Sequence, residues 1–308
     1  MRLAMSPVGT SSALQAHPTI TLEQNGYTYT VQTKDGKSTY TVTDGTNTLT
    51  IPIRWALGMR SQTWLLEKDG HYYESLVSYF QRDQSLGTTP GDDNIVPHTI
   101  DQAMGRELSI WEVRDCFTCH ASGYHPDENL DGQKLTPGVN CERCHAGAIE
   151  HSTDALHKDL TTLPDAFDDR DAGQISDFCG RCHRTWDRVV REGWHGPPTV
   201  RFQPYRLANS RCFDARDKRI SCLACHDPHK DDTHDEAFYD SKCLACHAGT
   251  ASPAARSMAS STAVPKVCPV AKDNCVSCHM PKVALAGGHA VFTDHEIRIV
   301  RPGDQYPN

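Results

Sequence analysis

The sequence predicts two parts, a small antiparallel β-rich N-terminal domain over residues 1–110 and a mostly irregular, short-helix domain over residues 111–308. Three observations predict this division. Runs of β-branched and aromatic residues lie in the first part, and all 14 cysteines lie between Cys116 and Cys278. Only 38% of residues are hydrophobic and 7% aromatic, which is too few for a large apolar core. Something other than apolar side chains must therefore fill the second domain.

The N-terminal domain is expected to be a series of β-hairpins. Residues 27–31 and 38–42 have the residue types of strands. Turn-forming pairs fall between such runs, at Asn25-Gly26, Asp35-Gly36, Asp44-Gly45 and Asp69-Gly70. The domain has no cysteine and no cluster of acidic residues, so we interpret it as a structural or docking lobe without chemistry of its own.

Beyond Cys116 the helical signals are short and interrupted, as in the loop from Pro126 to Gly138. A five-residue motif repeats here at irregular spacing, which excludes a solenoid of fixed period. The motif is Cys-x-x-Cys-His, and its six copies are Cys116/Cys119/His120, Cys141/Cys144/His145, Cys179/Cys182/His183, Cys222/Cys225/His226, Cys243/Cys246/His247 and Cys275/Cys278/His279.

This motif is the attachment site of haem c. Its two thiols lie one helical turn apart and can bond to the two vinyl groups at one porphyrin edge, while the histidine is held as the proximal iron ligand. Chance would supply about 0.03 copies at this cysteine and histidine content. Zinc ribbons and redox-active or disulfide-forming CxxC pairs are the alternatives, and neither requires the histidine. The sequence therefore predicts six covalently bound haems.

The haems are expected to stack against one another. Residues 111–308 provide about 33 residues for each of the six motifs, too few to give every cofactor its own pocket. We therefore expect a multihaem domain organised around stacked haems, through which electrons can pass.

Eleven histidines remain as candidates for the distal iron ligands, enough for all six irons to be bis-histidine. We favour four: His151 and His229, which closely follow motifs, and His289 and His295, which bracket a short segment after the last one. Such residues reach a neighbouring iron more easily than the iron of the haem at the nearest motif in sequence.

The spacing of the other histidines does not favour one of them over another as a distal ligand. Candidates for the remaining positions are His17, His98, His125, His157 and His195, with His234 also competing. His71 follows Asp69-Gly70 and is expected to be an exposed turn residue. Cys212 and Cys268 belong to no motif, and an even leftover pair in an oxidising compartment favours a disulfide, with two reduced thiols as the alternative.

Charge and hydropathy limit the partners. A net charge of -8 gives no basic patch for nucleic acid. No run of apolar residues is long enough to span a membrane. Because haem attachment of this kind follows export in bacteria, we expect a periplasmic or extracellular protein whose signal peptide lies outside these residues.

The residues around the motifs resemble a bacterial family of multihaem c-type cytochromes, in the broad lineage that includes hydroxylamine oxidoreductase and pentahaem nitrite reductase. The stretches that carry the resemblance are 141–145 with His151, 179–186, 200–207, 221–229, 274–282 and 292–298. Relatives typically have a further CxxCH shortly before the segment that corresponds to residues 1–6, and these residues contain none. The resemblance implies bis-histidine haems and electron transfer.

Three functions are compatible with this sequence. The first is an electron carrier, soluble or polymerised end to end through haem contacts into an extracellular conductive filament, which exchanges electrons with redox partner proteins or extracellular acceptors. The second is an enzyme that acts on a small nitrogen or sulfur compound at one open haem. The third is a structural haem-binding module of a larger complex. The first is favoured because the histidines are sufficient to ligate every iron.

Overall fold

The computed structural model describes residues 5–7, 11–122, 135–157, 167, 169–248, 267–285, 287 and 289–307. The chain divides into two compact units. The N-terminal unit comprises Met1–Ala166 with Ala286–Ala290, and the C-terminal unit comprises Phe167–Leu285 with Val291–Asn308. This division differs from the expected boundary near residue 110, because the helix that bears the first CxxCH motif packs onto the sheet.

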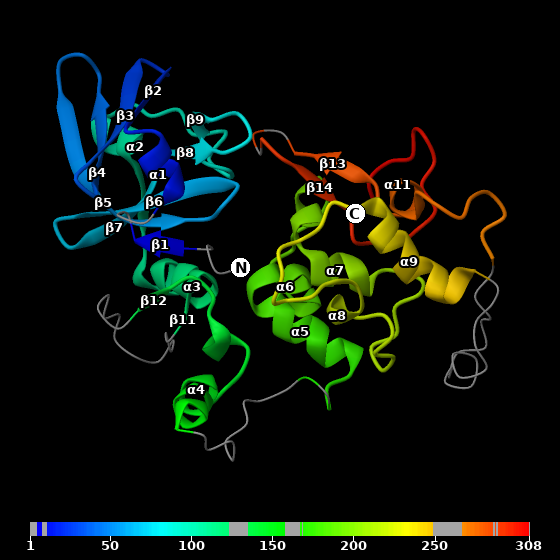
Figure 1. Cartoon of the computed structure of the whole chain (residues 1–308). Helices are drawn as coiled ribbons and strands as arrows, with labels where there is room; N and C mark the ends of the chain where they lie inside the picture. The colour runs from blue at the N-terminus through cyan, green and yellow to red at the C-terminus, as the bar shows by residue number, and fades with distance from the viewer. Residues whose placement is uncertain are drawn as a thin grey trace. The chain divides into compact units, whose positions relative to one another are not determined.

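The N-terminal unit is built on an antiparallel sheet of ten strands (Figure 1). Its main path runs in the order β10-β7-β6-β5-β4-β3-β2, while β1 pairs with β5, and β8 pairs with β6 and β9. The strands are β1 (Met5–Pro7), β2 (Thr19–Gln24), β3 (Tyr27–Lys34), β4 (Lys37–Thr43), β5 (Thr48–Leu57), β6 (Ser61–Lys68), β7 (His71–Ser75), β8 (Val77–Phe80), β9 (Ser85–Thr88) and β10 (Gly105–Leu108).

The expected hairpins are confirmed at their turns. Asn25 and Gly26, between β2 and β3, have φ angles of 52° and 80°, and Asp35 and Gly36, between β3 and β4, have 50° and 72°. Two successive left-handed residues form the turn whose twist matches the flanking strands. The register of the sheet follows from these short connections, which place each run of alternating residues opposite the next.

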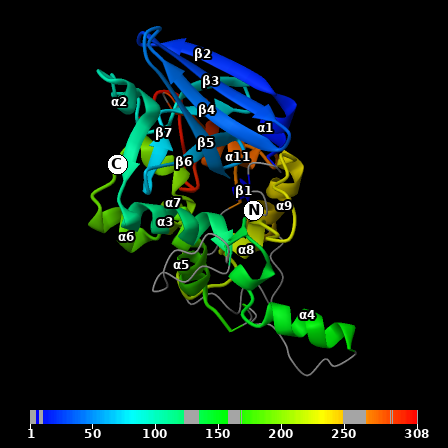
Figure 2. The same cartoon turned by 90° about the vertical axis from the view of Figure 1, so that its left-hand side faces the viewer.

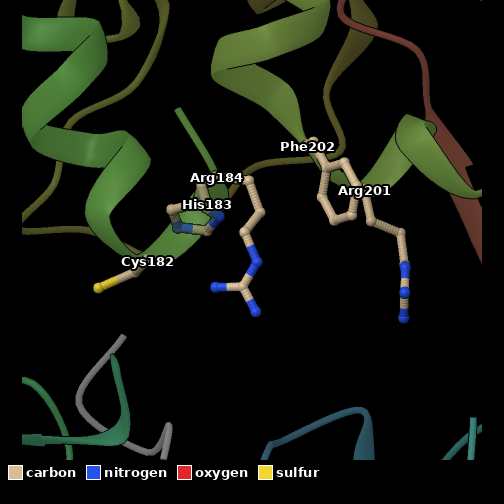
Figure 3. Close-up of a pocket in the computed structure, with 5 residues that line it drawn as sticks. All are labelled: Cys182, His183, Arg184, Arg201 and Phe202. Carbon is tan, nitrogen blue, oxygen red and sulfur yellow. The ribbon is translucent and has the colours of Figure 1, made fainter. Parts of the chain in front are cut away.

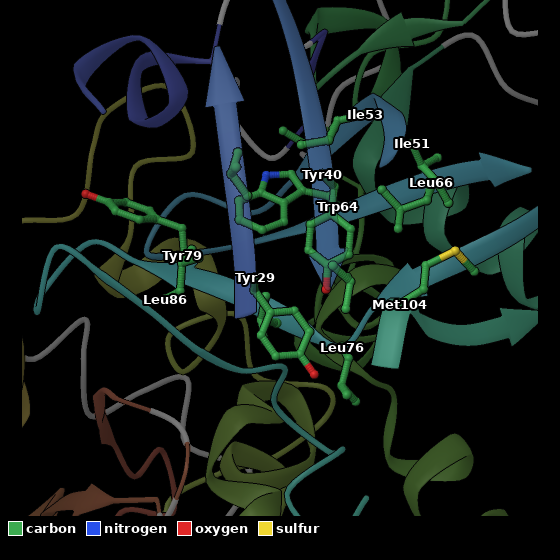
Figure 4. Packing of buried hydrophobic residues seen from close by; sticks show 14 of the residues in the cluster. Tyr29, Tyr40, Ile51, Ile53, Trp64, Leu66, Leu76, Tyr79, Leu86 and Met104 are labelled. Carbon is green, nitrogen blue, oxygen red and sulfur yellow. The ribbon is translucent and has the colours of Figure 1, made fainter. Parts of the chain in front are cut away.

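One face of this sheet carries the main apolar core (Figure 4). Val31, Tyr40 and Trp64 are fully buried, and they come from three different strands. Alternate residues of β4 are buried, as expected of a sheet with one covered face. Short helices α1 (Ser12–Ala16) and α2 (Ile100–Met104) add Leu14 and Met104 to the cluster.

A second apolar cluster joins the sheet to helix α3 (Ile110–His120), and Figure 2 shows α3 below the strands. Val113 and Phe117 are buried in it, and the Phe117 ring meets the Trp55 ring edge-on with 6.1 Å between centroids. The same unit holds the β11 (Ala121–Ser122) and β12 (Thr136–Pro137) pair, the 3-10 turn η2 (Cys141–Arg143) and helix α4 (Ala148–Leu156).

The C-terminal unit consists of short helices and turns with one small hairpin (Figure 1). Its elements are α5 (Ala172–His183), α6 (Trp186–Arg191), η3 (Pro197–Arg201), α7 (Gln203–Ala208), α8 (Cys222–Cys225), α9 (Glu236–His247), α11 (Cys275–His279), β13 (Lys282–Ala284) and β14 (Val291–Thr293). Among the described residues, no helix has the length and apolar character needed to cross a membrane.

Candidate haem-binding motifs

The first motif ends helix α3, whose start is fixed by a capping box. The Ser109 hydroxyl accepts from the Glu112 N–H, and the Glu112 carboxylate accepts from the Ser109 N–H. Burial, with a smaller contribution from Glu74, raises the pKa of the Cys116 thiol to about 12. The sheet therefore holds Cys116, Cys119 and His120 on one half-buried helical turn.

The second motif departs from the expected helical turn. The 3-10 turn η2 covers only Cys141–Arg143, so Cys144 and His145 lie just beyond it. Their N–H groups both donate to the Cys141 carbonyl, at 3.1 and 2.8 Å. The Asn140 side chain makes no capping hydrogen bond at the start of this turn.

In this motif a 3-10 turn stands where a turn of α-helix was expected. Cys144 and His145 are half-buried, and a tight turn rather than a turn of α-helix positions them. The N–H groups of Cys144 and His145 still bond to the Cys141 carbonyl as in one helical turn, so the spacing of this motif remains that of the other five. Haem attachment at Cys141 and Cys144, with His145 as the proximal ligand, stays a prediction.

The second motif contacts the first. Arg143, inside the second motif, donates a hydrogen bond to the carbonyl of Thr118, inside the first. The connecting chain is fixed as well, since the Gly138 N–H donates to the His120 carbonyl at 2.9 Å and the Asn140 N–H donates to the Ser122 hydroxyl at 2.9 Å. Two motifs 25 residues apart in sequence are therefore neighbours in the N-terminal unit.

The third motif ends α5 in a tight reversal. Arg184 follows the helix with a φ of +70°, in the left-handed region, and the chain turns back so that Thr185 lies against Gly180. A Cβ on Gly180 would lie 2.8 Å from the Thr185 side chain, so the motif needs glycine at this position. Thr185 then caps α6 by accepting from the Arg188 N–H.

The third and fourth motifs meet at their first cysteines. The thiols of Cys179 and Cys222 are hydrogen-bonded to each other, which raises the pKa of Cys179 and lowers that of Cys222. The fourth motif forms the one-turn helix α8, from Cys222 to Cys225. The C-terminal unit therefore brings together two motifs whose first cysteines are separated by more than 40 positions in the printed sequence.

The fifth and sixth motifs are joined by Asp240, a residue that sequence analysis did not identify. Asp240 lies on α9, is 7% exposed, and accepts from the Asn274 N–H at 2.7 Å and from the Cys275 N–H at 2.8 Å. It thereby supplies the N-terminal cap of α11, which carries the sixth motif. An aspartate three residues before a CxxCH was the available signal, but its partner could not be read from sequence.

The fourth motif lies next to the fifth. Burial and the thiol of Cys225 raise the pKa of Cys243, whereas its hydrogen bond with Cys275 lowers it. Consecutive motifs are therefore neighbours throughout the C-terminal unit, from the third to the sixth.

Three imidazoles are oriented by backbone carbonyls. The Nδ1 atoms of His279, His295 and His195 lie 3.0, 2.9 and 2.8 Å from the carbonyl oxygens of Arg298, Thr293 and Gly193. Because a carbonyl oxygen only accepts, each Nδ1 must donate, which leaves Nε2 unprotonated in the neutral ring. This is the arrangement found in metal-bound histidines.

His295 lies close to His226, the histidine of the fourth motif. The ring centroids of His226 and His295 are 6.2 Å apart, with planes inclined by 30°. Two imidazoles on opposite sides of one metal ion, with bonds of about 2 Å, would have ring centres roughly 6 Å apart. The spacing therefore fits two axial ligands of one iron.

The surroundings of both rings fit the same role. His226 Nδ1 lies 3.3 Å from the Asp232 carboxylate, so its Nε2 is also the nitrogen available to a metal. Burial, followed by the nearby His226 and His183 rings, lowers the pKa of His295 to about 4. A neutral imidazole is the form that ligates iron.

A buried ion-pair network fixes the segment that carries His295. Arg206 and Asp294 are both fully buried, and the guanidinium donates to the two carboxylate oxygens at 2.9 and 3.0 Å. Arg206 also pairs with Glu296 at 2.6 Å, and Arg298 pairs with Asp294 at 2.6 Å. Both carboxylates adjoin His295, so its backbone is held on either side.

The other distal candidates have varied surroundings. In the N-terminal unit, His17 Nε2 lies 2.9 Å from the Tyr79 hydroxyl, and His289 Nδ1 lies 2.6 Å from the Asp83 carboxylate while its ring packs 4.0 Å from the Phe80 ring. His71 is exposed, as expected, and pairs with Glu107. His151 is half-buried on α4, the exposed candidates are His98, His157, His195, His229 and His234, and His125 lies outside the described residues.

Cys212 and Cys268 are free thiols in the structure, and their disulfide remains a prediction. Burial raises the pKa of Cys212, and the motif thiols of Cys246 and Cys225 add to this rise. Cys212 therefore lies beside the fourth and fifth motifs.

An open pocket adjoins the third motif (Figure 3). It is lined by Cys182, His183, Arg184, Arg201 and Phe202. Burial, followed by the charge of Arg184, lowers the pKa of Arg201. A thiol, an imidazole and an aromatic ring on one pocket suit an attached porphyrin, and the two guanidinium groups suit its carboxylates.

Taken together, the motif residues fit haem c. In five motifs the thiol pair lies on a single helical turn, in the second Cys144 follows a 3-10 turn, and the oriented imidazoles leave Nε2 for iron. Within the described ranges, no group of three or more histidine, cysteine, aspartate or glutamate side chains is arranged to hold a metal ion by itself.

One comparison with known proteins agrees with this donor set. A family model described as cytochrome c554 and c-prime matches residues 94–146, a stretch that includes the first two motifs. No curated protein and no solved structure matches the chain.

Proposed function

We propose that the chain is a c-type cytochrome, as the family match over residues 94–146 supports, and that it transfers electrons along six haem c groups with every iron ligated by two histidines. One observation carries this proposal: consecutive motifs are in contact within each unit. Haem c, when bound, supplies one-electron exchange at its iron. The residues of this chain attach it, orient its ligands and keep successive sites close.

The twelve motif cysteines hold the cofactors covalently. This mode of attachment suits a C-terminal unit that has little apolar interior of its own. Of the large fully buried apolar side chains in the described residues, Trp64, Tyr29, Tyr40, Phe80 and Phe117 all belong to the N-terminal unit. The C-terminal unit therefore depends on its cofactors for a core.

The motif histidines supply the proximal ligands, and we propose His295 as the distal ligand opposite His226. Their separation and their Nδ1 acceptors support this pair. His151, His229 and His289 remain candidates for other irons. Ligation by two imidazoles favours low midpoint potentials, since a methionine ligand raises the potential.

We further propose an exported protein, periplasmic or extracellular, that exchanges electrons with redox proteins or extracellular acceptors. End-to-end assembly through haem contacts is part of the same proposal. The predicted covalent attachment of haem at the CxxCH motifs supports export.

The proposal is tested by intact mass, a pyridine haemochrome assay and the ferric spectrum of the purified protein. We expect a mass increase of six haems and a wholly low-spin spectrum. A spectrum with a high-spin fraction that shifts when nitrite or cyanide is added would instead favour an enzyme with one open haem. The observation that favours this second candidate is that Arg184 and Arg201 line one pocket with His183.

A further inference from the structure

Two arginines face one pocket beside the third motif. Figure 3 shows the side chains of Arg184 and Arg201 extending in the same direction, with the Cys182 thiol on the same side of the pocket. The pocket has a volume of about 210 Å³, and the share of one water molecule in liquid is about 30 Å³. The space is therefore large enough for a carboxylate or a small oxyanion.

Neither guanidinium has a carboxylate partner in the described part of the chain. Arg184 lies over the Trp194 ring, 5.7 Å from its centroid, and Arg201 lies over the Phe202 ring at 6.0 Å. The other arginines close to an acid, such as Arg206 and Arg219, pair with it directly. Two like charges that share a pocket without a counterion are unfavourable, and an anion between them would relieve both.

The backbone favours the same interpretation. Arg184 occupies the helix-ending position with a left-handed φ of +70°, where glycine or asparagine is the usual residue. A long cationic side chain is placed here despite its Cβ, and the guanidinium points into the pocket (Figure 3). Strained positions of this kind occur where a side chain has a binding role.

We propose that Arg184 and Arg201 form a carboxylate-binding site, and that they bind the propionates of the haem attached at Cys179 and Cys182. The inference rests on the proposed function, because Cys182 and His183, which belong to the motif that would attach this haem, line the same pocket. Planar guanidinium groups bind carboxylates through paired hydrogen bonds. A free oxyanion such as nitrite or sulfite has the same chemistry and is the other source of ligand.

The test compares wild type with Arg184→Gln, Arg201→Gln and the double variant. Arg201→Lys retains the charge, and Arg191→Gln removes one charge from an exposed position at the end of α6 in the same unit. Peptide mass spectrometry first establishes whether haem is attached at Cys179 and Cys182 in each protein. Potentiometric titrations then follow the haems with and without added nitrite or sulfite.

If the propionates are the ligand, the midpoint potential of one haem falls in each single variant and falls further in the double variant. The reason is that loss of a positive charge favours the ferric state. Arg201→Lys should retain most of the wild-type midpoint potential, and Arg191→Gln should have the potential of wild type. Added oxyanion should leave the potentials and the spectrum unchanged. If a free oxyanion is the ligand, wild type shows a saturable spectral change whose half-saturation concentration rises at least tenfold in the double variant.

Both of those results support an anion site and identify its occupant. The inference is overturned if the variants retain the third haem and match Arg191→Gln in potential and in oxyanion response. Absence of haem from Cys179 and Cys182 in wild type would instead contradict the proposed function at this motif. Should the double variant fail to fold, the single variants and Arg201→Lys decide the question.

Discussion

The His226 and His295 rings face each other at 6.2 Å between centroids, although 68 residues separate them along the chain. His279, the motif histidine nearest to His295 in sequence, has its Nδ1 bonded to the Arg298 carbonyl and is not the ring that His295 faces. If His295 ligates the iron opposite His226, it serves a haem other than that of the nearest motif, and this stays a prediction. It also makes specific outcomes measurable.

Replacing His295 by alanine should leave six haems attached and convert one iron to high spin with a raised potential. The covalent bonds to Cys222 and Cys225 do not depend on His295, whereas one axial bond does. Electron paramagnetic resonance of the ferric protein measures the change. His71→Ala, at an exposed imidazole paired with Glu107, is the control and should remain low-spin. A wholly low-spin His295→Ala protein would remove His295 from the ligand set.

Replacing Arg206 by methionine should destabilise the protein by about 3–5 kcal/mol, because Asp294 would be left as a buried charge without its main partner. The same variant should add a high-spin fraction, since Asp294 and Glu296 hold His295 from both sides. Denaturant unfolding and the ferric spectrum measure the two effects.

The exposed pair of Arg219 with Asp217 provides the matched control. Arg219→Met should lower the free energy of unfolding by less than about 1 kcal/mol, because surface ion pairs contribute little, and it should leave the ferric spectrum unchanged. A loss of stability in Arg206→Met with no spectral change would mean that the network supports the fold without positioning His295.

Replacing Asp240 by alanine should loosen the sixth motif. The variant loses the acceptor for the Asn274 and Cys275 N–H groups, and loss of such a cap costs about 1 kcal/mol. We expect lower haem occupancy at Cys275 and Cys278, measured by peptide mass spectrometry. The haem occupancy of Asp240→Asn, which retains one acceptor oxygen, should lie between those of wild type and Asp240→Ala. Equal occupancy in all three proteins would contradict this role.

Replacing Cys243 and Cys246 together by alanine should lower the intact mass by one haem beyond the loss of two sulfur atoms, because both thioether bonds are removed. The other five motifs should stay loaded, giving five irons in place of six. Iron analysis measures this ratio. Zinc in place of iron, or an unchanged haem count, would contradict the assignment of the motif.

Replacing Asp92 by asparagine should stabilise the protein at neutral pH. Burial, with Glu74 nearby, raises the pKa of Asp92 to about 6, and its Oδ2 atom has no hydrogen-bond partner within the described residues. The native state then binds more protons than the unfolded state between about pH 4 and pH 6, so stability falls as the pH rises through this window.

The gain from Asp92→Asn should therefore be about 1–3 kcal/mol at pH 7 and vanish below about pH 4. Urea unfolding at several pH values, followed by the far-ultraviolet signal of the sheet, measures it. A gain that is the same at pH 4 and pH 7 would show that the carboxylate is not the cause.

Two features could be predicted from the sequence, namely haem attachment at the six motifs and the hairpins of the N-terminal part. Both are local, because Asn25-Gly26 fixes a turn through the φ angles of two adjacent residues and a CxxCH spans five. The motif sequence does not by itself fix an α-helical turn, since Cys144 and His145 lie beyond a 3-10 turn. The compact N-terminal unit extends past the expected boundary near residue 110, since Phe117 packs against Trp55 in a contact that no local pattern contains.

Only the tertiary structure decided which groups meet. His229 and His295 were favoured on similar grounds, yet the structure leaves the His229 side chain 74% exposed and brings His295 to His226. His289 is bonded to Asp83, 206 residues away. The partners of Asp240 and Arg206 could not be read from the sequence because they lie 34 and 88 residues distant. Ligand pairing depends on such long-range contacts, and these are set by packing of the whole chain.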